Sequence, residues 1–410
     1  MTLFLNSFAQ ENPADTLRKD ALNVYMTASD YVRKEIPYVN YVRDIKDADV
    51  YIISTRDAVG SGGYEYKYFL VGQKSNTGMA DTISFVATPG ETEEEIRVKQ
   101  VRTLKMGMMR YVAKTPLAQY MNINFTQPLS ETVSSDKWNS WVFRASLSGY
   151  LNGEQTYKSS STYGDISANR VTQKWKISIR GRYNFNKQVF EIDNEKISSE
   201  NNSRSLSSMI VRSISDHWSY GGSAYLGSSS YSNEDLSIRF MPGLEYDLFP
   251  YSESTRRQLR LLYSVGYNYV NYTDSTIYDM LREGHFQHSF NMAYEVVQKW
   301  GSIELELGYS NYLHNWSRNN ISAFGYMNFR VYKGFNINFG GGASIIHDQL
   351  GLVKSGATTE EILLRRKEIE TSFNYFMSFG FSFTFGSIYN NVVNPRFGNI
   401  GGGGMTIMIN

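Results

Sequence analysis

The stretch TSFNYFMSFGFSFTFGS, residues 371–387, places a large apolar side chain at every odd position from Phe373 to Phe385. Its even positions are mostly small or polar, as at Asn374 and Ser378. Alternation with a period of two predicts a β-strand that has one apolar face and one polar face. The surroundings of that aromatic face therefore decide the class of the protein.

The same alternation runs through residues 138–387, where helical periodicity is absent. Trp175, Ile177 and Ile179, for example, alternate with Lys176 and other polar residues. We expect about twelve antiparallel strands, with ten or fourteen also compatible. The expected segments lie near residues 139–154, 160–171, 173–190, 204–215, 218–230, 234–249, 257–272, 285–298, 301–313, 320–332, 334–347 and 370–387.

The connections between these segments differ in length. SDHWSYG, FPYSESTRR, VQKWGS and VYKGF are short, whereas DNEKISSENN, NYTDSTIYDMLREG, HNWSRNN and IHDQLGLVKSGATTEEILLRRKEIET are longer and polar. Short turns on one rim and long loops on the other are typical of outer-membrane barrels, whereas a soluble sandwich has short connections at both ends. Aromatic residues near the strand ends fit an interfacial girdle: Trp138, Trp141, Trp218, Trp300, Tyr251 and Tyr312. The sequence predicts a membrane all-β fold, an approximately twelve-stranded transmembrane β-barrel whose apolar face meets lipid.

Residues 16–128 have a mixed pattern that predicts a small α/β domain. DADVYIISTRDA and YEYKYFLVGQ are expected to be strands joined as a hairpin through VGSGG. DYVRKEIPYVNYV predicts a short helix that ends before Pro37, and QYMNINF predicts a last strand. A longer helix is expected in ETEEEIRVKQVRTLKMGMMRYVAKT, because Thr92 and Glu95 form a capping box. Its expected apolar stripe comprises Val98, Val101, Leu104, Met108 and Val112.

The remaining parts of the chain are short. Residues 129–137 are interpreted as a polar linker, and residues 388–410 as a Gly-rich C-terminal tail. Residues 1–15 are interpreted as a signal-peptide remnant and lead-in, because they contain SFA, the small-x-small form of a cleavage site. An ordinary apolar start is the alternative. An even number of strands puts the linker and the tail on the same rim, so residues 16–128 are expected in the periplasm.

The composition excludes several classes of function. The chain has no Cys, which excludes disulfides, thiolate metal sites and cysteine nucleophiles. Its formal net charge of +1 gives no reason to expect a nucleic-acid partner. No apolar run reaches the length of about 18 residues that a transmembrane helix needs. ETEEE lacks the spacing of a calcium loop and GSGG lacks the Lys of a phosphate loop, so no metal or cofactor is expected.

The alternation, the girdles and the turn asymmetry of residues 138–387 resemble those of bacterial outer-membrane β-barrels. The stretch EIPYVNYVRDIKDADVYIISTRDAVGSGGYEY is similar to one in uncharacterised bacterial envelope proteins that pair a small α/β domain with such a barrel. A looser likeness, through the barrel alone, is to salt-induced outer-membrane proteins. These resemblances imply a location in the outer membrane and a shape, and they imply no chemistry.

Two short motifs raise the question of catalysis. In HWS, residues 217–219, a His and a Ser lie on one face of a strand, which resembles the catalytic pair of outer-membrane phospholipase A. His217 would then be the base and Ser219 the nucleophile. That enzyme has its pair on the outer rim, whereas SDHWSYG is expected to be a periplasmic turn. HFQHS at residues 285–289 is a second such pair, and for both the alternative is an interfacial histidine in an aromatic belt.

Charged residues are expected on the inner face of the barrel. The basic ones come mainly from the earlier strands: Arg144, Lys176, Arg180, Arg182 and Arg239, with Arg330 as a later exception. The acidic ones come from later strands: Glu295, Glu304 and Glu306. Opposite signs on opposite walls would select polar solutes in an open lumen. Alternatively the charges pair and plug a narrow barrel.

Three functions follow from these expectations. The first is an envelope scaffold or accessory subunit, in which the periplasmic domain binds a periplasmic or outer-membrane protein and the barrel is the anchor in outer-membrane lipid. The second is a channel for small polar solutes. The third and most remote is an outer-membrane lipid hydrolase.

Overall fold

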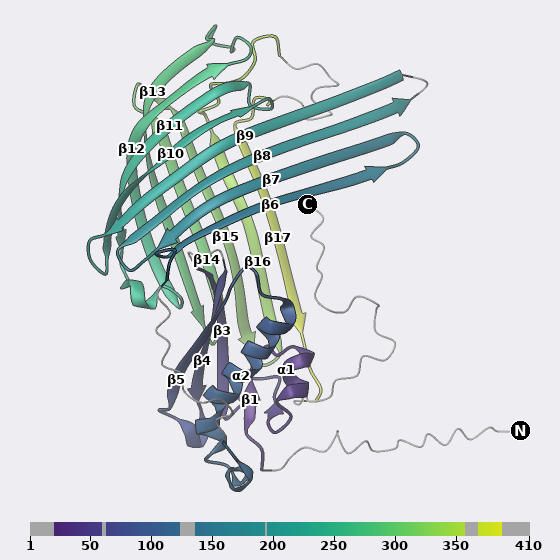
Figure 1. The fold of residues 1–410 in the computed structure, drawn as a ribbon, viewed down its shortest axis with the longest axis vertical. Coiled ribbons are helices and arrows are strands. Elements are labelled where there is room, and N and C mark those ends of the chain that lie inside the picture. Colours follow the sequence, from purple (N-terminus) through teal and green to yellow (C-terminus); the bar gives the residue numbers. More distant parts are fainter. Residues whose placement is uncertain (1–19, 60–62, 124–135, 193–194, 357–367, 388–410) are drawn as a thin grey trace, which may run out of the picture. The chain divides into compact units, whose positions relative to one another are not determined.

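The computed structural model describes residues 20–59, 63–123, 136–192, 195–356 and 368–387. The expected signal-peptide remnant, the C-terminal tail and most of the expected linker lie outside these residues. The chain forms two compact units, one with a five-stranded sheet and the other with a twelve-stranded sheet (Figure 1). The protein is therefore mostly β, with few helices.

The first unit is a mixed sheet whose strands lie in the order β2-β1-β3-β4-β5. β1 pairs in parallel with both β2 and β3. The strands are β1 (Asn23–Tyr25), β2 (Asn40–Tyr41), β3 (Val50–Ala58), β4 (Tyr64–Gly72) and β5 (Ala80–Ala87). The helices are α1 (Asp30–Glu35) and α2 (Glu93–Val112), with short 3-10 turns at η2 (Lys74–Asn76) and η3 (Pro116–Tyr120).

The capping box predicted for the long helix is present at the start of α2. The hydroxyl of Thr92 accepts a hydrogen bond from the Glu95 N–H at 3.3 Å, and Glu95 Oε2 accepts one from the Thr92 N–H at 2.7 Å. Two free N–H groups of the first turn are thereby satisfied. No helix in the described ranges is both long and apolar enough to cross a membrane.

The buried side of α2 differs from the predicted stripe at one end. Leu104 and Met108 are fully buried as expected, but Val98 is 50 % exposed. The helix approaches the sheet most closely at Gly107, where a Cβ would lie 2.3 Å from Ile83 Cδ1. Burial is therefore centred on the later turns and includes Tyr111, which the sequence pattern missed.

The strand predicted for QYMNINF is wrong for the residues that the structure describes. η3 covers its first two residues, and residues 121–123 form no strand. Pro116 stands at the first helical position, where proline favours a helix start, and the Thr115 hydroxyl caps the Leu117 N–H. These two local interactions explain the turn.

The second unit confirms the prediction of twelve antiparallel strands. Each strand pairs with its neighbours in the sequence, so the sheet is one continuous meander (Figure 1). Its first six strands are β6 (Trp141–Gly153), β7 (Tyr157–Val171), β8 (Trp175–Ile192), β9 (Glu195–Ser213), β10 (Trp218–Ser229) and β11 (Glu234–Asp247). The last six are β12 (Arg257–Tyr272), β13 (Arg282–Gln298), β14 (Gly301–Tyr312), β15 (Asn315–Tyr332), β16 (Phe335–Ile346) and β17 (Phe373–Phe383).

The registers give the sheet one apolar face and one polar face. Residues directly opposite each other in neighbouring strands share a face. One row of such residues crosses eight strands and is almost entirely polar: Arg144, Ser167, Arg180, Ser207, Tyr225, Arg239, Asn268 and His285. The other face bears the apolar partners, such as Phe329, Ile337 and Phe381. We call these two surfaces the polar face and the apolar face.

The predicted asymmetry of the connections is only partly observed. Residues 195–202 of DNEKISSENN lie in β9, and β14 and β15 are joined through residues 313–314 alone. Residues 273–281 and 347–372 remain as long connections at one end of the sheet, but residues 248–256 form a comparable connection at the other end. Polar strand tips were therefore mistaken for loops.

Three connections at one end of the sheet pack against each other. The side chain of Asn233 donates hydrogen bonds to the carbonyl oxygens of Asp274, at 2.9 Å, and Gly351, at 3.1 Å. Thr276 forms an isolated bridge with Val353 and is fully buried. These contacts join residues 230–233, 273–281 and 347–356 into a cap.

The sheet is open in the part of the chain that the structure describes. β6 pairs with β7 alone and β17 with β16 alone, so the pairing that would close a barrel is not formed. Side chains on both faces of these two edge strands are mostly exposed. A large antiparallel sheet is therefore established, and its closure is a separate question.

Candidate functional site

The nine charged residues predicted for the inner surface all lie on the polar face. They come from six strands, and the registers place each of them opposite other polar-face residues. They are Arg144, Lys176, Arg180, Arg182, Arg239, Glu295, Glu304, Glu306 and Arg330. The polar face is therefore the surface on which a site for a polar ligand or solute would be built.

A hollow of about 370 Å³ lies on the polar face between β11 and β17. Glu306, Arg260 and Asn291 contribute polar groups to its lining. Phe324 and Phe376 also line it, and their ring centroids are 6.2 Å apart. Bulky aromatic side chains thus occupy part of the space in front of the polar face.

Basic residues on the first strands have an acidic partner that the sequence analysis missed. Asp165 Oδ2 of β7 lies 3.4 Å from Arg180 Nε and 3.7 Å from Arg182 Nε, both of β8. Asp165 belongs to a weakly alternating segment, so its face could not be assigned from the pattern. Within the described ranges, no ion pair or hydrogen bond is formed by the side chain of Arg144 or Lys176.

The acidic residues further along the sheet are only partly neutralised. Glu245 of β11 lies 3.9 Å from Arg260 Nη1 of β12, and Gln258 donates a hydrogen bond to Glu295. Among the described residues, Glu304 and Glu306 form no ion pair and no side-chain hydrogen bond. Charge on the polar face is therefore segregated, positive toward β6 and β8 and negative on β14.

His217 and Ser219 are not arranged as a base and a nucleophile. His217 Nδ1 lies 2.8 Å from the carbonyl oxygen of Asp247, and the Ser219 hydroxyl donates to Glu245 Oε1 at 3.3 Å. Ser219 is also buried. Each side chain is held by a different partner, and no hydrogen bond joins the two.

A polar cluster near the capped end of the sheet was not predicted. Glu283 accepts hydrogen bonds from the Tyr272 hydroxyl and from His285 Nε2, both at 2.6 Å. His285 stacks on His314, with ring centroids 3.8 Å apart. Burial, and then the neighbouring His285, lowers the pKa of His314. No spacing in the sequence indicates these contacts, because three separate segments supply them.

The second histidine–serine motif is divided between the two faces. His285 belongs to the polar face, whereas His288 belongs to the apolar face, where its Nδ1 lies 3.4 Å from the Tyr263 hydroxyl. His288 also contacts the ring of Trp316. No group of three or more acidic or histidine side chains in the described ranges is placed to hold a metal ion.

Comparisons with known proteins do not assign the chain to a family. No protein-family model matches it, and no curated protein matches its sequence.

Proposed function

We propose that the chain is an outer-membrane β-barrel protein that anchors its α/β unit in the envelope as a scaffold or accessory subunit. The observation that supports this proposal is that apolar side chains of the twelve-stranded sheet are exposed while polar side chains on its other face are buried. Phe240 and Phe286, on the apolar face of the inner strands β11 and β13, are 58 % and 60 % exposed, whereas Ser237 and Asp247 of the polar face are 1 % and 2 % exposed. A water-soluble sheet buries its apolar face, and a barrel in lipid does the reverse.

The tryptophans support the same proposal. Trp141, Trp175 and Trp218 begin β6, β8 and β10, and Trp300 lies in the turn before β14. Because the strands alternate in direction, these four residues lie at the same end of the sheet. Tryptophan is enriched where a protein crosses the interface between lipid and water, so this end matches one girdle of a membrane protein.

The strand registers predict which residues of β6 and β17 would pair if the sheet closes into a barrel. Successive registers, extended by one or two residues where no pair is formed, connect Trp141 at the start of β6 with Thr371, just before β17. Twelve strands tilted by about 35–45°, spaced about 4.8 Å apart, need a stagger of roughly 12–17 residues. Trp141 would then lie near the opposite end of β17.

The two faces restrict that stagger further. It must be even, because an odd stagger would join the apolar face of one edge to the polar face of the other. Trp141 would therefore lie opposite Phe383, Phe385 or Ser387. A stagger of about 14 residues pairs the whole of β6 with residues 373–385, and we propose this register.

Cysteine cross-linking tests the seam, because the chain has no Cys of its own. The proposed register places Ser148 opposite Ser378 on the polar face. We expect the double variant Ser148→Cys with Ser378→Cys to form a disulfide in the membrane-inserted full chain. Cysteines at 146 or 150 in place of 148 report the two neighbouring registers, and Ser207→Cys with Ser378→Cys is the negative control. Cross-linking in none of the three test pairs would exclude closure through β6 and β17.

An anchor accounts for the polar face better than an open pore. Phe324 and Phe376 fill space in front of it, Asp165 forms ion pairs with Arg180 and Arg182, and a cap of connections forms at one end of the sheet. The segregated charge favours a channel for small polar solutes as a second candidate. We propose no catalytic role for His217 or Ser219, since their side chains are held apart.

The partner expected for the α/β unit is a periplasmic or outer-membrane protein. Co-purification of the full chain from cross-linked envelopes tests this expectation. Recovery of the chain alone, together with lipid, would contradict the scaffold role while leaving the membrane location intact.

A further inference from the structure

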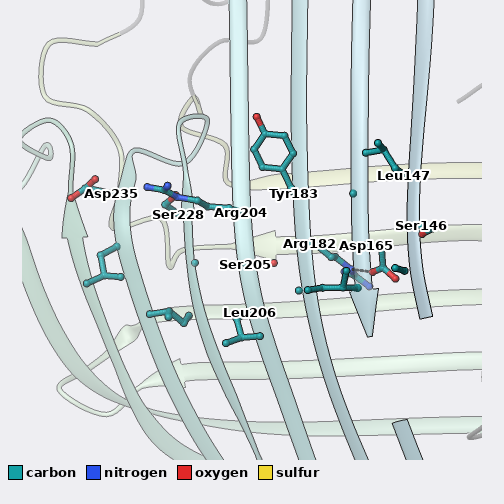
Figure 2. Close-up of a pocket in the computed structure, with 17 residues that line it drawn as sticks. Ser146, Leu147, Asp165, Arg182, Tyr183, Arg204, Ser205, Leu206, Ser228 and Asp235 are labelled. Carbon is teal, nitrogen blue, oxygen red and sulfur yellow. Dashed lines mark hydrogen bonds and ion pairs between the residues drawn. The ribbon is translucent and has the colours of Figure 1, made fainter. Parts of the chain in front are cut away.

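A large groove lies mainly on the apolar face between β6 and β11, although Asp165 and Arg182 of the polar face also line it. Its volume is about 910 Å³, which is in the range of sites that hold small organic ligands. Large apolar side chains line it, among them Leu147, Tyr183 and Leu206 (Figure 2). Leu226 and Leu236 also line it. The groove therefore suits a ligand that is mainly apolar.

Glycines in the strands produce the hollow. One row of opposite residues runs Leu147, Gly164, Tyr183, Arg204 and Ser228 across five strands. At Gly164, a Cβ would lie 3.7 Å from Tyr183 Cβ and 3.9 Å from Leu147 Cδ1, so the space between these two large side chains is open. Gly181 also lines the groove, but a Cβ there would lie 3.0 Å from Ile166 Cγ1, so Ile166 occupies the space beside it.

Arg204 places a positive charge on this apolar lining. Its Nε donates a hydrogen bond to the Ser228 hydroxyl at 3.1 Å, and Figure 2 shows the two side chains together with Asp235 beyond them. Arg204 forms no ion pair within the described residues. Asp235 accepts a hydrogen bond from Asn271 instead. The terminal nitrogens of Arg204 are therefore available to an anion in the groove.

We propose that this groove binds one phosphate-bearing membrane lipid, with acyl chain along the leucine wall and phosphate at the Arg204 guanidinium. The proposal rests on the proposed membrane location of the apolar face. A guanidinium presents paired N–H donors that match phosphate oxygens, and such charge-assisted bonds strengthen where water is excluded. Arg182, which also lines the groove, is paired with Asp165, whereas Arg204 has no acidic partner among the described residues. An apolar wall beside this guanidinium matches the division of a phospholipid into tail and headgroup.

The test compares two lipids with the same acyl chains. Full-length protein in detergent is titrated with phosphatidylglycerol and with diacylglycerol, which lacks the phosphate, and bound lipid is counted by native mass spectrometry. We expect wild-type protein to bind phosphatidylglycerol on the order of tenfold more tightly, because a hydrogen bond to a charged group has roughly that effect. Equal binding of the two lipids would overturn the proposal.

Variants distinguish lipid binding in the groove from general contact of the protein with lipid. Arg204→Gln should abolish the preference for phosphatidylglycerol, whereas Arg144→Gln, an arginine on the polar face of β6, should leave it unchanged. Gly164→Leu should weaken binding of both lipids by filling the hollow, and Gly153→Leu, at the open end of β6, is its control. An unchanged preference in Arg204→Gln would overturn the assignment of the phosphate to this residue.

Flotation with phospholipid vesicles separates failure of this proposal from failure of the membrane assignment. Protein that floats with the vesicles but shows no lipid preference would contradict the groove alone. Protein that stays in the aqueous fraction would contradict both proposals.

Discussion

Leu104 shows how one residue of α2 holds the first unit together. It is fully buried in a core that also includes Val50, Leu70 and Met108. Replacing a leucine in such a site by alanine removes apolar contact and leaves a cavity, which costs about 2–5 kcal/mol of unfolding free energy.

We therefore expect Leu104→Ala to destabilise the α/β unit by about 2–5 kcal/mol. Hydrogen exchange of the α2 amides in the full chain measures the change. Val98→Ala is the matched control on the same helix, since Val98 is half exposed, and it should change stability by less than about 0.5 kcal/mol. Similar effects of the two substitutions would contradict the orientation of α2.

Glu95 and Glu91 predict a pH dependence for the same unit. Hydrogen bonds from Thr92, first its backbone N–H, lower the pKa of Glu95, and Lys99 is the main cause of the lowered pKa of Glu91. Both pKa values lie below the ordinary value of 4.5, so the stabilisation is complete above that pH. It is lost as the pH falls through the lowered values of the folded state.

We expect the α2 helix to melt at lower temperature as the pH falls from near neutral to about 3. Glu95→Gln should reduce the slope of that change, because the variant has one fewer carboxylate to protonate. Thermal melts of the full chain by far-UV circular dichroism, in detergent, measure the slope. Glu93→Gln is the control, since Glu93 takes no part in the capping box. Equal slopes for wild type and Glu95→Gln would contradict the assignment.

At the scale of elements, the sequence predicted what a repeating pattern can encode. Most of the twelve strands of the large sheet, and the faces of the nine charged residues chosen from it, follow from alternation, whereas the segment of β7 alternates only weakly. The start of β9 was missed because it is mostly polar on both faces, as expected of a strand that extends beyond an apolar layer. The cluster at Glu283 was missed because only folding brings Tyr272, His285 and His314 together.

The turn between β13 and β14 requires glycine. Gly301 has a φ of 144°, and a Cβ there would lie 1.8 Å from the backbone oxygen of Asn328. We expect Gly301→Ala to cost on the order of 1–3 kcal/mol through strain and displacement of β15. Denaturant unfolding of the detergent-solubilised chain measures this, with Gly153→Ala, where the added Cβ meets nothing, as the control. A neutral Gly301→Ala would contradict this register of the hairpin.

At the scale of the whole molecule, the proposed anchor role predicts that the protein does not conduct ions across a bilayer. Phe324 and Phe376 meet on the polar face, and the cap covers one end of the sheet. We expect no steady unit currents when wild-type protein is added to a planar bilayer. The double variant Phe324→Ala with Phe376→Ala should increase conductance, whereas Phe379→Ala, on the apolar face, should not. Steady currents through wild-type protein would favour the channel.

The sequence could not settle whether the sheet closes. Alternation specifies the two faces of β6 and β17 but contains no information about which edges meet, because backbone hydrogen bonds at an edge are independent of side-chain type. The registers limit the seam to a few possibilities only after all the intervening strands are placed.

The unbroken order of neighbouring strands has a consequence for how the molecule assembles. Each of the eleven pairings joins two strands that are consecutive in the chain, so most of them can form with short loops and little loss of chain entropy. The proposed seam alone joins the two ends of the sheet, and we expect it to form last. A chain delayed before that step would expose two aromatic-rich edges, which are able to recruit other strands into aggregates.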